Sequence, residues 1–169
     1  MVKSRLLLVL VLITVAATGT LSGASAGASE LDGQGLRCES TAFRRGLYTE
    51  GCAAVWAYPD YSYIVGLTEA SAYKLVDGQR VPTEKVLVRI ARSYIYVNGV
   101  QADARPCSCG PAAYVRDATR NVQPGQLPSG NTAQAAVTYE VWAVRGPRQV
   151  LVETHTVMSE VVATPDVAG

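Results

Sequence analysis

The sequence predicts an all-β protein, built as a small antiparallel two-sheet sandwich and stapled by two disulfides, with a small β-barrel as the alternative. Three observations support this fold class. Turn-forming pairs recur about every ten residues, the segments between them alternate apolar and polar side chains, and almost no segment has helical periodicity. About seven or eight such segments match the number of strands in sandwiches and small barrels. The four cysteines provide the staples.

The N-terminus has the pattern of a secretory signal peptide. Two positive charges lie within Met1–Arg5, an apolar run follows over residues 6–17, and small polar residues occupy 18–29. A membrane span needs about 20 apolar residues, and this run is shorter. We therefore expect a secreted, extracellular protein, cleaved after Ala28, with cleavage after Ala26 as the alternative.

Cleavage at this site defines the expected domain organisation. The signal peptide is 1–28, a flexible leader is 29–36, a single all-β domain is 37–163, and a frayed tail is 164–169. Removing the signal peptide takes two of the 15 basic residues, so 13 face 14 acidic ones and the net charge is −1. This balance gives no reason to expect nucleic acid or an anionic membrane as the partner. The abundance of Arg, Ala, Val and Gly suggests a GC-rich bacterial genome.

All four cysteines lie beyond the cleavage site: Cys38, Cys52, Cys107 and Cys109. An even number in an exported domain predicts a disulfide framework. A bond within Cys107-Ser108-Cys109 would close a very small, strained ring. We therefore expect Cys38 and Cys52 to pair with Cys107 and Cys109, in an order left open. In the alternative, Cys38 pairs with Cys52 and leaves a C-x-C pair suited to copper binding or disulfide exchange. We favour structural crosslinks, with no metal and no cofactor.

The first half of the domain alternates strand and turn signals. Pro59-Asp60 is a turn pair, and Asp77-Gly78 and Asn98-Gly99 are strong two-residue hairpin signals. Within residues 85–92 the apolar side chains repeat with a period of two, as in a half-buried strand. The expected strands are 53–58, 61–67, 72–76, 85–92, 93–97 and 100–103.

The second half contains the clearest hairpin. A strand is expected at 112–118 and a surface loop at 123–132, which is rich in turn formers. Residues 134–145 and 149–161 are then joined by Gly146-Pro147-Arg148. Such a three-residue loop sets Glu140 opposite Thr154, Trp142 opposite Val152, and Tyr139 opposite His155. A loop shorter by one residue would set Glu140 against Glu153, a like-charge pair that sheets avoid. The expected register clusters Trp142, Val144, Val150 and Val152 on one face.

Candidate catalytic groups are few. His155 is the only histidine and shares a strand face with Glu153. The carboxylates of Glu140, Glu153 and Asp117 would suit glycoside hydrolysis if they converged in space. No nucleophile elbow or phosphate-binding loop is present in the sequence. We expect no catalytic residues and keep a small secreted enzyme, a hydrolase, as the alternative.

Aromatic residues near the first turn are the candidate binding residues. Trp56 and Tyr58 share a strand face by their spacing, and Tyr61 and Tyr63 share one beyond the turn. Tyrosine suits positions with one wet end, although aromatic side chains on strands also pack in cores. We therefore expect a non-catalytic binding or inhibitory module for an extracellular protein, peptide or carbohydrate.

Overall fold

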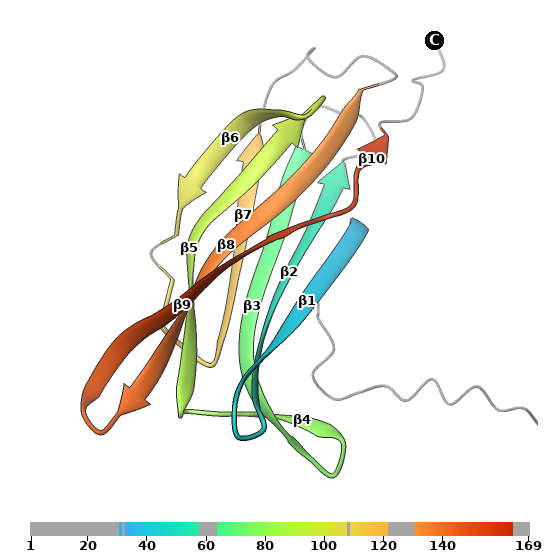
Figure 1. Cartoon of the computed structure of the whole chain (residues 1–169). Coiled ribbons are helices and arrows are strands. Elements are labelled where there is room, and N and C mark those ends of the chain that lie inside the picture. Colours follow the sequence, from blue (N-terminus) through green and yellow to red (C-terminus); the bar gives the residue numbers. More distant parts are fainter. Residues whose placement is uncertain (1–30, 32, 58–63, 108, 122–130, 164–169) are drawn as a thin grey trace, which may run out of the picture.

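The computed structural model describes residues 31, 33–57, 64–107, 109–121 and 131–163. Within these residues the chain forms two antiparallel sheets of five strands each, stacked face to face (Figure 1). The sheets stay separate, so the predicted sandwich is confirmed over the barrel. No helix in the described part of the chain is long and apolar enough to cross a bilayer.

The first sheet begins with a meander of three strands. Its members are β1 (Gln34–Arg44), β2 (Leu47–Ala57), β3 (Ile64–Val76), β4 (Gln79–Pro82) and β7 (Tyr114–Asn121). β7 pairs with the first part of β3, and β4 pairs with its last four residues, on the side of β3 away from β2. The edges of this sheet are therefore β1 on one side and β7 with β4 on the other.

The second sheet is centred on two long strands. Its members are β5 (Val86–Val97), β6 (Val100–Pro106), β8 (Thr132–Arg145), β9 (Arg148–Met158) and β10 (Val162–Ala163). β5 pairs with β6 on one side and β8 on the other, and both β9 and β10 pair with the far side of β8.

The core lies between the sheets and follows the period of two. Fully buried side chains alternate along β5 (Val86, Val88 and Ile90) and along β8 (Val137, Tyr139 and Val141). Tyr139 is the largest of them, and it reaches across to Gly51 of β2. A Cβ atom at residue 51 would lie 2.8 Å from Cδ1 of the Tyr139 ring. Glycine at this position therefore makes room for the ring.

The predicted two-residue turns are confirmed. Asp77-Gly78 connects β3 to β4, and Asn98-Gly99 connects β5 to β6, with positive φ at all four residues. That is the conformation a type I′ hairpin turn requires. A third turn of this kind, Arg45-Gly46, connects β1 to β2 and was not predicted. Pro59-Asp60 and most of the expected loop at 123–132 lie outside the described residues.

Several strands are longer than predicted. β1 begins at Gln34, within the expected leader, and Leu31 is buried. β3 runs without a break where two strands, 61–67 and 72–76, were expected. β5 likewise joins 85–92 to 93–97 through an irregularity at Ala91. Ladder hydrogen bonds continue through these polar or irregular stretches because strands on both sides hold them.

The β8–β9 hairpin has the predicted register at its centre but not at its turn. Glu140 faces Thr154 and Tyr139 faces His155, as expected. Arg145 pairs with Arg148, so the turn is the two residues Gly146 and Pro147, and a bulge then leaves Val152 unpaired. Trp142 consequently faces Leu151, and the predicted pairing with Val152 is wrong.

The expected disulfide connectivity is also wrong. Cys38 and Cys52 face each other across β1 and β2, with Cα atoms 4.1 Å apart, and form one disulfide. Cys107 and Cys109 form the other, with Cα atoms 5.2 Å apart. The physical reason is that β1, which carries Cys38, lies at the edge of the first sheet opposite β7, whereas the C-x-C pair lies in the connection that leads into β7. Bonds between the two pairs would have to cross the sheet.

Candidate functional site

The structure describes one of the four candidate aromatic residues. Trp56 lies on the face of β2 that points away from the core, and it is 45% exposed. Tyr58, Tyr61 and Tyr63 lie outside the described residues. The exposed position of Trp56 is compatible with a recognition surface, but the described part of the chain offers a larger candidate elsewhere.

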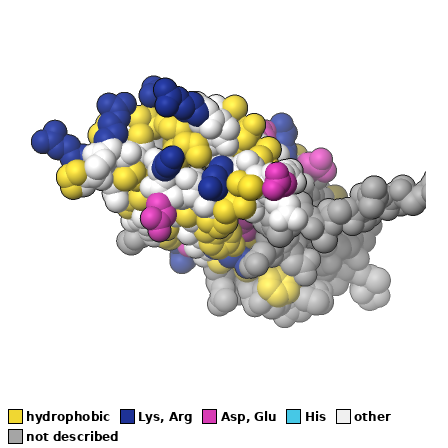
Figure 2. Space-filling model, turned by 90° about the horizontal axis from the view of Figure 1, so that it is seen from below, with side chains coloured by type: hydrophobic (Ala, Val, Ile, Leu, Met, Phe, Trp, Pro, Cys, Tyr) yellow, Lys and Arg dark blue, Asp and Glu magenta, His cyan; other side chains and the backbone are white. Residues whose placement is uncertain are grey.

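That candidate lies at the hairpin end, which we define as the end of the sandwich bearing the β1–β2, β3–β4 and β8–β9 turns and the β4–β5 connection (Figure 1). Seen from this end, Lys and Arg side chains gather on the surface with apolar side chains between them (Figure 2). The exposed cations are Arg44, Arg45, Lys74, Lys85, Arg145 and Arg148, and the exposed acids of the turns and connection are Asp77 and Glu84. The local charge is therefore strongly positive although the net charge of the whole chain is only +1.

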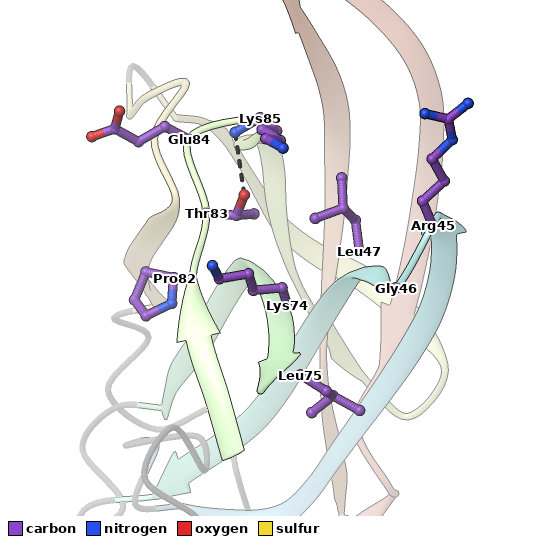
Figure 3. A pocket seen from close by; sticks show the side chains of 9 residues that line it. All are labelled: Arg45, Gly46, Leu47, Lys74, Leu75, Pro82, Thr83, Glu84 and Lys85. Atoms are coloured by element: carbon purple, nitrogen blue, oxygen red, sulfur yellow. Dashed lines mark hydrogen bonds between the residues drawn. The ribbon is translucent and has the colours of Figure 1, made fainter. Parts of the chain in front are cut away.

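A groove of about 650 Å³ opens at this end. It is lined by Arg45, Gly46, Leu47, Lys74, Leu75, Pro82, Thr83, Glu84 and Lys85. Leu47 lies between Arg45 on one side and Lys74 and Lys85 on the other (Figure 3), and it also packs against the core. The groove thus has an apolar floor continuous with the sandwich interior and a cationic rim.

The cationic rim has no carboxylate partner within the described residues. None of Arg45, Lys74 and Lys85 forms an ion pair there, and the backbone N–H of Lys85 donates a 3.3 Å hydrogen bond to the Thr83 hydroxyl. That bond orders the β4–β5 connection from which Glu84 and Lys85 project. The charges of the rim are therefore available to an external anion.

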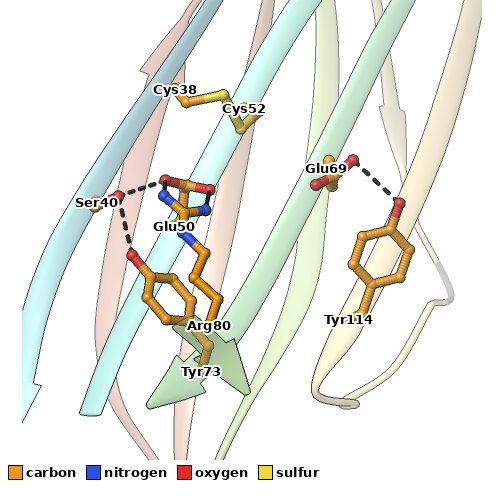
Figure 4. Close-up of a disulfide and its surroundings, with 8 residues drawn as sticks. All are labelled: Cys38, Ser40, Glu50, Cys52, Glu69, Tyr73, Arg80 and Tyr114. Atoms are coloured by element: carbon orange, nitrogen blue, oxygen red, sulfur yellow. Dashed lines mark hydrogen bonds and ion pairs between the residues drawn. A yellow bond between two sulfur atoms is a disulfide. The ribbon is translucent and has the colours of Figure 1, made fainter. Parts of the chain in front are cut away.

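The outward face of the first sheet carries an ordered polar network (Figure 4). Glu50 is 4% exposed, and Arg80 holds it through a bidentate pair in which Nη2 donates to Oε2 at 2.8 Å. Ser40 also donates to Glu50, and the Tyr73 hydroxyl donates to Ser40 at 3.3 Å. Arg80 lies 4.5 Å above the Tyr73 ring, which stacks on Tyr48. The hydrogen bond with Glu50 raises the pKa of Arg80, and burial opposes it.

The same face also contains a direct tyrosine–carboxylate contact. The Tyr114 hydroxyl donates a 3.1 Å hydrogen bond to Glu69, which is almost fully buried. Because Glu50 and Glu69 each accept hydrogen bonds from neighbouring strands, the network serves to order β1, β2, β3, β4 and β7 relative to one another. Its acids are therefore occupied in structural contacts.

The candidate acid–base residues do not converge. His155 Nε2 lies 3.0 Å from a Glu153 oxygen, and the imidazole packs on the Tyr139 ring. Glu140 lies on the opposite face of the second sheet, where Arg89 Nε (2.9 Å) and Trp142 Nε1 (3.0 Å) donate to it. Asp117 belongs to the first sheet. The hydrolase alternative gains no support from these positions, and it stays a prediction.

Sequence reasoning missed the cations of the groove. They come from separate segments, the β1–β2 turn, the end of β3 and the β4–β5 connection, so no spacing in the sequence joins them. The only local signal is the pair Arg44-Arg45 next to Gly46, which marks a charged turn. Comparisons with protein-family models, curated proteins and solved structures find no match to this chain.

Proposed function

We propose that the mature chain is a secreted, non-catalytic binding module that receives an acidic, partly apolar peptide segment of an extracellular protein in the hairpin-end groove. The observation that carries this proposal is the cationic rim around an apolar floor, in a domain whose net charge is close to zero. Secretion is part of the proposal and rests on the N-terminal pattern and on the disulfides.

The chemistry of the rim favours carboxylates. Guanidinium groups bind carboxylates through two parallel hydrogen bonds, and ammonium groups act as point charges. Arg45 supplies the first kind of group, and Lys74 and Lys85 supply the second. Glu84 also lies on this rim, so the three cations leave a net charge of about +2 there. A ligand with several carboxylates can contact more than one of the cations and is therefore attracted more strongly than a ligand with one carboxylate.

The floor adds an apolar requirement. Leu47 presents an aliphatic side chain inside the groove. Leu75, which is 47% exposed, borders the groove from the opposite face of β3. Burying an aliphatic side chain of the ligand against Leu47 contributes about 25 cal/mol per Å² of apolar surface removed from water. The volume of the groove, about 650 Å³, accommodates a few side chains of a peptide rather than a whole folded partner.

The proposal is tested with the mature, disulfide-intact protein and two labelled peptides. In one peptide glutamates flank single leucines, and in the other lysines replace the glutamates. We expect fluorescence anisotropy to show binding of the glutamate peptide alone, weakening as salt is raised, because exposed charges are screened. The double variant Arg45→Glu/Lys74→Glu should bind it at least tenfold more weakly.

The control is Arg92→Glu, which reverses an exposed charge on β5 away from the groove. It should leave binding within about twofold of wild type, since screened charges act over roughly a Debye length. Three outcomes overturn the proposal: no binding of the glutamate peptide, equal binding of both peptides, or equal loss in the control. Binding of a neutral polysaccharide with a change in Trp56 fluorescence, without peptide binding, would instead favour a carbohydrate ligand.

A further inference from the structure

The C-x-C pair lies where the chain crosses from the second sheet to the first. Cys107 follows β6, and its backbone N–H donates to Ala91 of β5 at 3.4 Å. Ala112 then exchanges two backbone hydrogen bonds with Val88 of β5, at 2.8 and 3.0 Å. Cys107 and Cys109 are half-buried against the core. The other disulfide joins an exposed residue, Cys38, to Cys52, which is 1% exposed, so the two disulfides differ in loop length rather than in access. The crossing thus holds the C-x-C pair in place at an accessible edge of the sandwich.

An acidic side chain lies beside the two sulfurs. One oxygen of Asp117 and the sulfurs of Cys107 and Cys109 all lie within 4.8 Å of one another. Asp117 projects from β7 and accepts a 2.9 Å hydrogen bond from the Ser93 hydroxyl. Ser93 is in turn hydrogen-bonded to Thr68 at 2.8 Å, and both hydroxyls belong to fully buried residues. The buried hydroxyls fix the carboxylate of Asp117 next to the sulfurs.

The C-x-C bond constrains the chain far less than the other disulfide does. Its cysteines are two positions apart, whereas Cys38 and Cys52 are 14 apart. A crosslink stabilises a fold mainly by restricting the unfolded chain, and this effect grows with loop length. A bond that adds little stability, closes a very small ring and remains accessible is suited to exchange.

We propose that Cys107–Cys109 is a thiol–disulfide exchange site for dithiols of other exported proteins, with Asp117 as its proton acceptor. A thiolate of the substrate dithiol attacks one sulfur, the Cys107–Cys109 bond breaks, and a mixed disulfide forms. The second substrate thiolate then attacks that mixed disulfide. The substrate leaves as a disulfide, oxidised by two electrons, and Cys107 and Cys109 become two thiols, carrying the two protons that the substrate has lost.

The pair returns to its starting state by the same chemistry. One of the two thiols transfers its proton to the Asp117 carboxylate and attacks a low-molecular-weight disulfide such as oxidised glutathione. The remaining cysteine displaces the glutathione, and the Cys107–Cys109 bond re-forms with release of two reduced glutathione molecules. The role of Asp117 is to accept the proton of the thiol as it attacks, because the thiolate is the nucleophilic form.

The first test measures which disulfide exchanges. The mature protein is equilibrated in mixtures of reduced and oxidised glutathione, quenched in acid, alkylated and mapped by mass spectrometry. We expect the Cys107–Cys109 bond to open, and both cysteines to be alkylated, at a low concentration of reduced glutathione. Opening of Cys38–Cys52 should require at least ten times as much reduced glutathione. Opening of Cys38–Cys52 first, or of both disulfides together, would overturn the proposal.

The second test measures the role of Asp117. The rate at which the reduced pair is re-oxidised by oxidised glutathione should fall at least tenfold in Asp117→Asn and recover in part in Asp117→Glu. Asp103→Asn, a nearby acid of β6 that pairs with Arg105, is the matched control and should keep the wild-type rate. Ser93→Ala, which removes the hydrogen bond to the Asp117 carboxylate but keeps the carboxylate, should give an intermediate rate. It replaces Asp117→Asn in this test if that variant does not fold.

A wild-type rate in Asp117→Asn, or in Ser93→Ala where that is the variant tested, would remove Asp117 from the mechanism.

Discussion

At the scale of single residues, Tyr139 shows that burial can leave a polar group without a partner. Tyr139 lies on the inward face of β8 and is fully buried. Its hydroxyl makes no hydrogen bond with any described residue, and the buried Thr49 hydroxyl is in the same situation. Burial raises the pKa of Tyr139, and the nearby Thr49 and Thr41 hydroxyls oppose that shift only in part.

Replacing Tyr139 by phenylalanine should therefore matter only in alkali. At pH 7 we expect the stability to change by less than about 1 kcal/mol, because no hydrogen bond is lost. An unfolded tyrosine ionises near pH 10, and the folded pKa is higher, so the wild type loses stability as the pH rises from about 10 through the folded pKa. Tyr139→Phe has no proton to lose and should overtake the wild type there. Urea denaturation of both proteins from pH 7 to 11 measures the difference. If the stability of the wild type and of Tyr139→Phe changed in the same way with pH, the raised pKa of Tyr139 would be contradicted.

At the scale of elements, the β8–β9 hairpin separates what sequence can and cannot predict. Avoiding a Glu140–Glu153 pair correctly predicts that Glu140 faces Thr154. The structure achieves this with a two-residue turn and a bulge at Val152, rather than with a three-residue loop. Both solutions give the same central register. They differ at the turn and in the pairs next to it, and the sequence does not show that Val152 packs against the core.

The short strand β4 depends on one ion pair. β4 has four residues and pairs only with β3, yet Arg80 reaches past β3 to Glu50 on β2. Removing one partner of a buried pair leaves an uncompensated charge, whereas replacing both with apolar residues is often nearly neutral. We expect Arg80→Met to cost roughly 3–5 kcal/mol of stability and Glu50→Leu/Arg80→Met to cost much less.

Guanidinium denaturation is unsuitable for this pair because the denaturant screens charges, so urea midpoints should be compared. Arg89→Met is the control, since Arg89 is 39% exposed and contacts Glu140 on the other sheet. Exposed pairs contribute about 1 kcal/mol or less. A double variant as unstable as Arg80→Met would show that the network does more than neutralise Glu50.

At the scale of the whole molecule, local signals predicted the fold class, and long-range placement was missed. Asp77-Gly78 and Asn98-Gly99 predict their hairpins because a two-residue turn is set by adjacent residues. β1 was missed because it is an edge strand whose side chains are mostly exposed, which removes the apolar alternation. The hairpin-end groove was missed because its cations meet only once the sandwich has formed.

The disulfide connectivity also depends on where the strands lie in the folded sandwich. The two disulfides should contribute different amounts to the stability of the fold. Cys38–Cys52 closes a loop of 14 residues between adjacent strands, so Cys38→Ala/Cys52→Ala should lose about 3 kcal/mol by the chain-entropy account. Cys107→Ala/Cys109→Ala should lose clearly less, because its loop is only two residues long. Urea unfolding of the mature protein and both double variants measures the losses, and peptide mapping of the non-reduced wild type checks the connectivity. Equal losses of stability in the two double variants, or peptides that link Cys38 to Cys107 or Cys109, would contradict this account. In it the core stabilises the sandwich, and only the Cys38–Cys52 crosslink at the sheet edge adds much by restricting the unfolded chain.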